Sequence, residues 1–259
     1  MTRDLKALLA SQSNTLGTWT QIAAPEMIDL IGLNGFHFTI IDCQHASIGI
    51  ETAENLARAA DANDIAVALR VTRNDPVEIM KALDAGIRHV VVPNVETPEE
   101  TAQAVAATKF GPHGLRGACP CCRSGGHFIR NWEAYVEAEE SRTGAIALVE
   151  TELGHRNIDG IASTPGLAAL MVGPFDLSVS MGFNGDWRHP SVVCAVHDIL
   201  SAGARYGVPT IMPVFAPSVA ECAELVAKWK DQSVTNFVIG SDKIIVADAS
   251  ANWSASLSL

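Results

Sequence analysis

The sequence is poor in basic side chains. Its 18 lysines and arginines are outnumbered by 29 aspartates and glutamates, and the formal net charge is −11 at pH 7. This balance repels a polyphosphate backbone and offers no basic stripe along which a nucleic acid could lie. We therefore expect no nucleic acid among the partners of the protein.

The sequence also lacks an apolar run long enough to span a membrane. Near the N-terminus, Arg3, Asp4 and Lys6 surround an apolar stretch that is too short and too interrupted for a signal peptide or a transmembrane helix. We therefore expect a cytoplasmic protein that has no membrane partner.

The six cysteines do not indicate a disulfide framework. In a chain of this size without a secretion signal, they are interpreted as reduced thiols. The segment Cys119–Cys122 has the CxxC spacing of redox motifs and zinc sites, but a second pair is missing, and only His113 and His127 could complete a zinc site. We interpret these cysteines as ordinary loop thiols.

No glycine-rich phosphate turn follows an early strand, which argues against a doubly wound dinucleotide-binding sheet. Short apolar runs instead alternate with longer amphipathic stretches, the pattern of parallel strands joined by crossover helices. With 259 residues and 48% apolar composition, the chain fits one (β/α)₈ TIM barrel, an α/β fold, as a single domain over residues 1–259. The predicted strands are Leu16–Thr20, His37–Asp42, Ala66–Arg70, His89–Pro93, Ala145–Glu150, Ala169–Gly173, Pro209–Val214 and Asn236–Gly240. The predicted helices include Glu51–Ala62, Pro76–Ala85, Pro98–Ala107, Ser191–Tyr206 and Ser218–Lys230.

The stretch 111–132 is rich in glycine, proline and cysteine and is too irregular to be a simple connection. Active sites of barrels lie at the carboxyl ends of the strands, under the loops that follow them. We therefore expect residues 111–132 to form a long active-site loop over these strand ends.

Polar side chains interrupt the apolar runs where several strands end. Asp42 ends the second predicted strand with His45 just beyond it, Arg70 ends the third, Glu150 ends the fifth, and Asp176 follows the sixth. Alone, each has an ordinary explanation, since a strand-end aspartate is often a helix cap and an arginine often an ion-pair partner. Together, two carboxylates at neighbouring strand ends are what a hard divalent cation requires.

These residues lie in segments that resemble the HpcH/HpaI aldolases, which include 4-hydroxy-2-oxoheptanedioate aldolases. The resemblance implies a barrel of the phosphoenolpyruvate/pyruvate superfamily. It also implies a class II aldolase, a carbon–carbon lyase that cleaves or forms 4-hydroxy-2-oxo acids through a pyruvate enolate held on a divalent cation. The matching segments are Leu16–Trp19, Gly35–Asp42 with His45, Leu83–Gly86, Val92–Val95, Gly111–Gly117, Val149–Thr151 and Val172–Ser178.

The resemblance assigns a role to each strand-end residue. It implies that Glu150 and Asp176 bind Mg²⁺ or Mn²⁺, with Co²⁺ also suitable, and that water and pyruvate oxygens complete the coordination. Arg70 would stabilise the enolate oxygen, and His45 would act as the acid and base for the 4-hydroxyl proton. Asp42 would anchor the residues around them.

The resemblance also implies further site residues. Asp84 would orient His45, either within the chain or across a subunit interface, and the turn Gly173–Asp176, with Pro174 and Phe175 between, would receive the pyruvate carboxylate. Where the family commonly has Asp-x-Glu-His, this chain has Gln44 before the histidine, a candidate substrate contact that removes one negative charge.

Two partners are implied, pyruvate and an aldehyde acceptor, in a homo-oligomer, commonly a hexamer built as a trimer of dimers with the last helix exchanged. Residues 118–127 depart from the family pattern, which leaves the aldehyde open. Three alternatives remain. They are an oxaloacetate decarboxylase using the same enolate, an acyl-CoA ester lyase, which the acidic composition argues against, and an inactive barrel that works through Cys119–Cys122.

Overall fold

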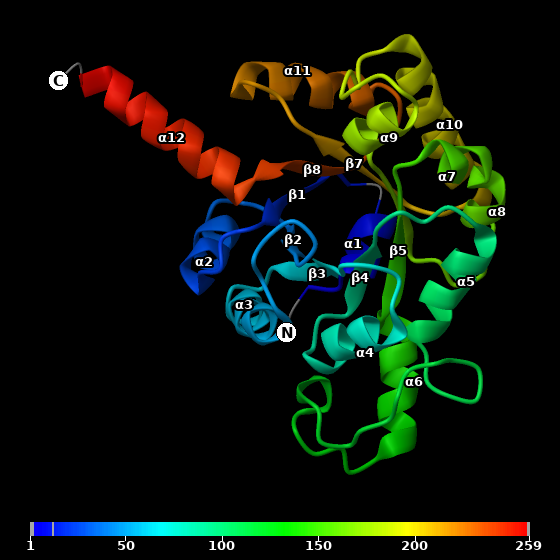
Figure 1. Ribbon diagram of the computed structural model, residues 1–259. Helices are drawn as coiled ribbons and strands as arrows, with labels where there is room; N and C mark the ends of the chain where they lie inside the picture. The colour runs from blue at the N-terminus through cyan, green and yellow to red at the C-terminus, as the bar shows by residue number, and fades with distance from the viewer. Residues whose placement is uncertain (1–2, 12, 258–259) are drawn as a thin grey trace.

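Eight parallel strands form a closed barrel in chain order in the computed structural model, which describes residues 3–11 and 13–257 (Figure 1). The predicted barrel is confirmed, and each predicted strand boundary lies within one residue of the observed one. The strands are β1 (Thr15–Thr20), β2 (Phe38–Asp42), β3 (Ala66–Arg70), β4 (His89–Val92), β5 (Gly144–Val149), β6 (Ala169–Val172), β7 (Thr210–Val214) and β8 (Asn236–Ser241).

Helices surround the barrel, and the five predicted from the sequence are present as α3 (Ile50–Ala62), α4 (Pro76–Asp84), α5 (Pro98–Ala107), α10 (Pro190–Tyr206) and α11 (Val219–Lys230). Local start signals fix several of them. For example, the Asp75 carboxylate accepts hydrogen bonds from the first turn of α4, and Thr97 and Glu100 form a capping box on α5. The helices are α1 (Leu5–Ala10), α2 (Pro25–Leu33), α3 (Ile50–Ala62), α4 (Pro76–Asp84), α5 (Pro98–Ala107), α6 (Trp132–Arg142), α7 (Glu152–Arg156), α8 (Ile158–Ala162), α9 (Pro174–Ser180), α10 (Pro190–Tyr206), α11 (Val219–Lys230) and α12 (Asp242–Leu257).

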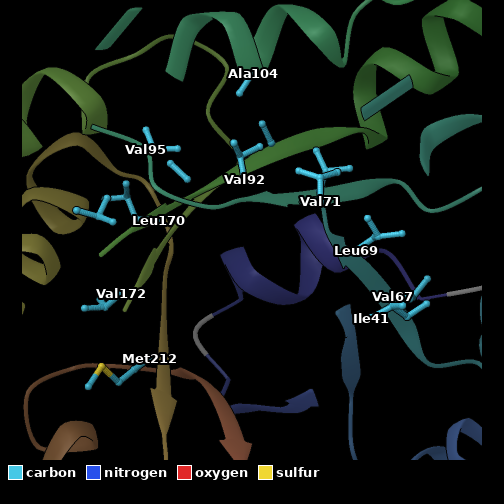
Figure 2. Packing of buried hydrophobic residues seen from close by; sticks show 14 of the residues in the cluster. Ile41, Val67, Leu69, Val71, Val92, Val95, Ala104, Leu170, Val172 and Met212 are labelled. Carbon is cyan, nitrogen blue, oxygen red and sulfur yellow. The ribbon is translucent and has the colours of Figure 1, made fainter. Parts of the chain in front are cut away.

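Two packed layers of apolar side chains hold the strands in place. Inside the barrel, side chains such as Phe38, Ile146 and Met171 form one cluster, which Leu5 and Leu9 of α1 close at the amino ends of the strands. Outside it, alternate strand residues pack against the helices, as Figure 2 shows for several of them. This alternation leaves the carboxyl ends of the strands free to carry polar groups.

The expectation that residues 111–132 cover the carboxyl ends of the strands is wrong within a single chain. This stretch connects α5 to α6, and α6 leads directly into the start of β5, so it lies at the amino ends of the strands. There the Arg123 side chain donates a hydrogen bond to the carbonyl of Ala85, just after α4, over 2.7 Å.

The last helix, α12, projects away from the barrel toward the C-terminus (Figure 1). Its apolar side chains are exposed, with Trp253 74% and Leu257 60% accessible to solvent. Within residues 3–11 and 13–257, no helix combines the length and the apolar character needed to cross a membrane.

Candidate active site

Asp42 and Arg70 lie side by side because β2 and β3 pair in a register that sets the two residues opposite each other. The Arg70 guanidinium donates from Nε to Oδ1 of Asp42 over 3.0 Å and from Nη2 to Oδ2 over 2.8 Å. Both side chains are buried. The pair therefore forms a two-pronged ion pair at the carboxyl ends of the strands.

Asp42 also receives hydrogen bonds from the loops around it. The Gln21 amide donates to Oδ2 over 2.8 Å, and the backbone N–H groups of Gln44 and His45 donate to Oδ1. Burial works to raise the pKa of Asp42, but the hydrogen bonds and charge of Arg70, together with Gln21, hold this pKa below its usual value. Asp42 is therefore a fixed anion that orients Arg70.

One face of the Arg70 guanidinium lies over an aromatic ring. Its Cζ atom lies 4.3 Å from the ring centroid of Trp19, at the end of β1. A guanidinium held over an indole ring gains cation–π attraction and loses freedom to rotate. The indole Nε1 of Trp19 is buried and has no hydrogen-bond partner among the described residues.

Glu150 follows β5 directly and is 4% exposed. Its Oε1 atom accepts one hydrogen bond, from the backbone N–H of Asn94, over 2.9 Å. Burial raises the pKa of Glu150 to about 7, and the charge of Asp176 acts in the same direction, against the Asn94 hydrogen bond and the charge of Arg70. Because Arg70 pairs with Asp42, the Glu150 carboxylate has no direct counter-ion in the described chain.

Asp176 lies in the first turn of α9, and Gly173 is the N-cap residue of this helix. Gly173 follows β6, beside Glu150, and a Cβ atom at this position would lie 2.4 Å from Cβ of Glu150 and 3.0 Å from its Oε2. Asp176 also has no ion-pair partner in the part of the chain that the structure describes. Two neighbouring carboxylates that are not paired with a basic side chain are suitable ligands for a hard divalent cation.

Within the described ranges, no three histidine, cysteine or acidic side chains gather closely enough to hold a metal ion by themselves. A cation bound here would therefore have two protein carboxylates as ligands, and water or substrate oxygens would supply the rest. This incomplete protein set is typical of sites in which a metal binds substrate directly.

These groups open into a cavity of about 520 Å³ at the carboxyl ends of the strands. Pockets of this size accommodate small-molecule ligands. The cavity is lined by Trp19, Gln21, Arg70, Leu148, Glu150, Met171, Val172, Gly173, Pro174, Phe175, Asp176, Trp187, Met212, Pro213, Val214, Phe215, Leu225, Trp229, Ser241, Lys243 and Ile244.

Four residues predicted for the site do not line this cavity, and one of them, Asp42, lies behind Arg70 and binds its guanidinium. His45 is exposed on the loop after β2, and the nearby Gln44 has a buried side-chain oxygen without a partner among the described residues. Asp84 ends α4 at the opposite end of the barrel, where Nη2 of Arg116 donates to its carboxylate over 2.8 Å. Within one chain, Asp84 is therefore not placed to orient His45.

The sequence did not identify several residues of the cavity. Trp19 lies in one of the family-like segments but carried no sign of a role at the site. Gln21 and Lys243 have no motif of their own, and they reach the cavity only because β1 and β8 are neighbours in the closed barrel. Asp242 strengthens this junction, because its carboxylate accepts hydrogen bonds from the backbone N–H groups of Gln21 and Ile22.

The proteins that are similar to this chain include aldolases and lyases. A model of the HpcH/HpaI aldolase/citrate lyase family matches residues 15–239. A 5-keto-4-deoxy-D-glucarate aldolase of Klebsiella pneumoniae is 32% identical over 237 residues, which cover 92% of this chain and 90% of that protein.

Solved structures give the same result. A HpcH/HpaI aldolase/citrate lyase family protein from Burkholderia cenocepacia matches with a TM-score of 0.91 and 28% identity, over 100% of both chains. The citrate synthase SbnG matches with a TM-score of 0.86 and 30% identity, over 98% of both chains. The names of the family and of the aldolase indicate a lyase or aldolase. The chain belongs to the HpcH/HpaI aldolase/citrate lyase family.

Proposed function

We propose that this protein is a class II aldolase that cleaves or forms 4-hydroxy-2-oxo acids, with pyruvate and an aldehyde as the two smaller molecules. The observation that carries the proposal is the pair of carboxylates on Glu150 and Asp176, which have no ion-pair partner among the described residues and line the same cavity as the Arg70 guanidinium. Such a cavity separates a cation site from a fixed positive charge, and a 2-oxo acid can lie between them.

Glu150 and Asp176 would hold the divalent cation, for which Mg²⁺, Mn²⁺ and Co²⁺ are all suitable oxygen-binding ions. When bound, the cation would act as a Lewis acid that makes the methyl protons of pyruvate more acidic. The backbone N–H groups of Phe175 and Asp176, at the same edge of the cavity, would receive the carboxylate of the substrate.

Arg70 is placed to stabilise the negative charge that develops on the keto oxygen. Its Nε and Nη2 atoms are engaged by Asp42, which leaves Nη1 to donate to a substrate oxygen. Because Asp42 and Trp19 already fix the guanidinium, little reorganisation is needed when charge develops.

His45 is proposed to transfer the proton of the 4-hydroxyl group. Its backbone is anchored to Asp42, and its exposed side chain lies on the loop beside the strand ends. Since Asp84 lies at the other end of the same barrel, it can orient His45 only from a neighbouring subunit.

A homo-oligomer, with a hexamer of three dimers as the expected form, is therefore part of the proposal. The exposed apolar side chains of α12, including Trp253 and Leu257, support it because such a surface favours contact with another chain.

Exchange of the pyruvate methyl protons for deuterium tests the proposal, because this reaction needs no aldehyde. We expect exchange that depends on added Mn²⁺ and disappears in Glu150→Gln and Asp176→Asn, while both variants keep the circular dichroism of the native fold. Asp186→Asn, which removes an exposed acid from the loop after α9, serves as the matched control and should retain exchange.

Metal-independent exchange, or full exchange in both ligand variants, would contradict the proposal. Oxaloacetate separates the related decarboxylase activity. If the enzyme releases CO₂ from oxaloacetate but yields no aldol product from pyruvate and any aldehyde, it is a decarboxylase.

A further inference from the structure

The cavity has two chemically different parts. Its polar part contains Arg70, Glu150 and Asp176, which belong to the proposed cation and pyruvate sites. Pyruvate has only six non-hydrogen atoms, so it occupies a minor part of the cavity of about 520 Å³. The rest of the cavity is open to whatever is joined to pyruvate.

That remaining wall is almost entirely apolar. It comes from the inner faces of β5 and β6, the outer face and end of β7, and the facing side of α11. Its side chains all lie in the same continuous cavity as the polar groups. Four of them are buried, Leu148, Met171, Met212 and Val214, whereas Leu225 is half-buried and Phe215 is exposed.

The polar side chains on this side of the cavity are mostly engaged elsewhere. The Gln21 amide donates to Asp42, and the Ser241 hydroxyl accepts the backbone N–H of Ile244 over 3.4 Å. Lys243 is the exception, because its exposed side chain has no ion-pair partner among the described residues. A substrate with several hydroxyl groups would leave most of them without partners against this wall.

We propose that the acceptor subsite takes an apolar aldehyde, with an alkyl or aromatic chain, in preference to a carboxylated or polyhydroxylated one. This inference rests on the proposed function and names the class of its second substrate. It differs from the sugar acid that the name of the 5-keto-4-deoxy-D-glucarate aldolase of Klebsiella pneumoniae denotes.

The reaction is balanced without any further reagent. The methyl carbon of pyruvate loses one proton and forms a bond to the carbonyl carbon of the aldehyde. The aldehyde oxygen gains one proton and becomes the 4-hydroxyl group. Cleavage is the reverse, and no electrons are exchanged with a third molecule.

Initial rates of aldol addition with pyruvate and Mn²⁺ test the inference on three aldehydes of similar size. They are pentanal, 4-oxobutanoate, which carries a carboxylate, and glyceraldehyde, which carries hydroxyls. We expect kcat/KM for pentanal to exceed both others by about tenfold or more, because burying extra methylenes and leaving polar groups unpaired each change kcat/KM by such factors.

Two variants of the wall sharpen the test. Phe215→Gln changes a side chain that is 44% exposed, and Leu225→Gln changes a half-buried one on α11. Each should lower the ratio of kcat/KM for pentanal to that for glyceraldehyde by about tenfold. Val219→Gln lies on α11 but outside the cavity, is 85% exposed, and should leave this ratio unchanged.

The outcomes separate this inference from the proposed function. If the wild-type protein exchanges the pyruvate protons but prefers glyceraldehyde, or shows no preference, the apolar subsite is wrong and the aldolase proposal stands. If 4-oxobutanoate reacts fastest and Lys243→Met removes that advantage, the subsite binds an anion and the inference is overturned. If no exchange occurs, the proposed function itself fails.

Discussion

The Arg70 guanidinium is bound at two points by the Asp42 carboxylate, Nε to Oδ1 at 3.0 Å and Nη2 to Oδ2 at 2.8 Å, although Glu150 lies across the same cavity. This pairing decides which carboxylate carries the counter-charge of the arginine. Asp42 remains ionised and neutralises Arg70, whereas burial and the charge of Asp176 raise the pKa of Glu150 to about 7. Arg70 and Asp42 therefore form one neutral pair, and Glu150 is not part of it.

Asp42→Asn should destabilise the fold because it leaves a buried guanidinium without its charge partner. We expect the free energy of unfolding to fall by about 3–5 kcal/mol, the usual cost of breaking a buried ion pair from one side. Chemical denaturation measures this change. Asp159→Asn, which breaks the exposed ion pair with Arg205, is the control and should change stability by less than about 1 kcal/mol. Similar small losses in both variants would show that the pair is not needed for stability.

Arg70→Lys should keep the positive charge but lose the planar two-point geometry and the stacking on Trp19. We expect kcat for aldol cleavage to fall on the order of a hundredfold, because a single ammonium cannot hold the same position relative to the developing charge. Steady-state kinetics of pyruvate release measures it, and Arg73→Lys, whose side chain is 74% exposed, is the control. A rise in KM with an unchanged kcat would reduce Arg70 to a binding residue.

Much of the fold could be predicted from the sequence because apolar runs and helix caps are local signals. The eight strands are examples, and so is the capping of α4 by Asp75. The position of residues 111–132 at the amino ends of the strands of their own chain could not be predicted, because the sequence gives no sign of α6. This helix buries only Tyr135 and Glu139 and therefore has no apolar stripe to reveal it. Without α6, the direction of the connection into β5 cannot be read.

The candidate site also contains residues that the sequence reveals and residues that it does not. Arg70 and Glu150 interrupt or end buried strands, which makes them visible in the sequence. The apolar wall is not visible, because Met212 and Leu225 are ordinary core residues by their local pattern. They line one cavity only because α11 packs against the outer face of β7, and no spacing in the chain encodes that arrangement.

Gly173→Ala should weaken cation binding while the backbone remains unstrained, since φ at this position is −113°. The added Cβ would lie 2.4 Å from Cβ of Glu150, so the carboxylate must move. We expect the Kd for Mn²⁺ to rise by about 10- to 100-fold, the range seen when groups that orient metal ligands are altered. Titration calorimetry measures it. Gly49→Ala introduces a methyl group with nothing within 4 Å and should bind Mn²⁺ normally. Equal Kd values in both variants would show that the position of the Glu150 carboxylate does not matter for Mn²⁺ binding.

His45→Ala should slow aldol cleavage much more than pyruvate exchange, because the proposed role of His45 concerns only the 4-hydroxyl proton. We expect kcat for cleavage to fall by about 10²- to 10⁴-fold, the usual contribution of a general acid or base. The rate of deuterium exchange should change by only a few-fold. His113→Ala removes another exposed histidine, on the loop before α6, and is the control. Parallel losses in cleavage and exchange would place His45 in the enolisation step instead.

His89 is a buried histidine at the opposite end of the barrel from the candidate site. Its ionisation makes the stability of the fold depend on pH. It begins β4, is 1% exposed, and its Nε2 atom has no hydrogen-bond partner among the described residues. Burial lowers the pKa of His89 to about 4, and the charges of nearby basic groups add to this against the opposing charge of Asp4. The folded protein therefore holds this imidazole neutral at a pH at which the unfolded chain would protonate it.

The sign of the effect follows from this difference in pKa. Above the unfolded pKa of about 6.5, His89 is neutral in both states and its full contribution to stability is present. As the pH falls toward 4, the unfolded chain takes up a proton that the folded one refuses, and up to about 3 kcal/mol is lost. Urea denaturation at pH values from 7 to 4 should give a shallower loss for His89→Gln than for the wild type, whereas His113→Gln should follow the wild type. Parallel curves for the wild type and His89→Gln would mean that the imidazole becomes protonated inside the fold without penalty, and the acid sensitivity of the barrel would then lie with its carboxylates.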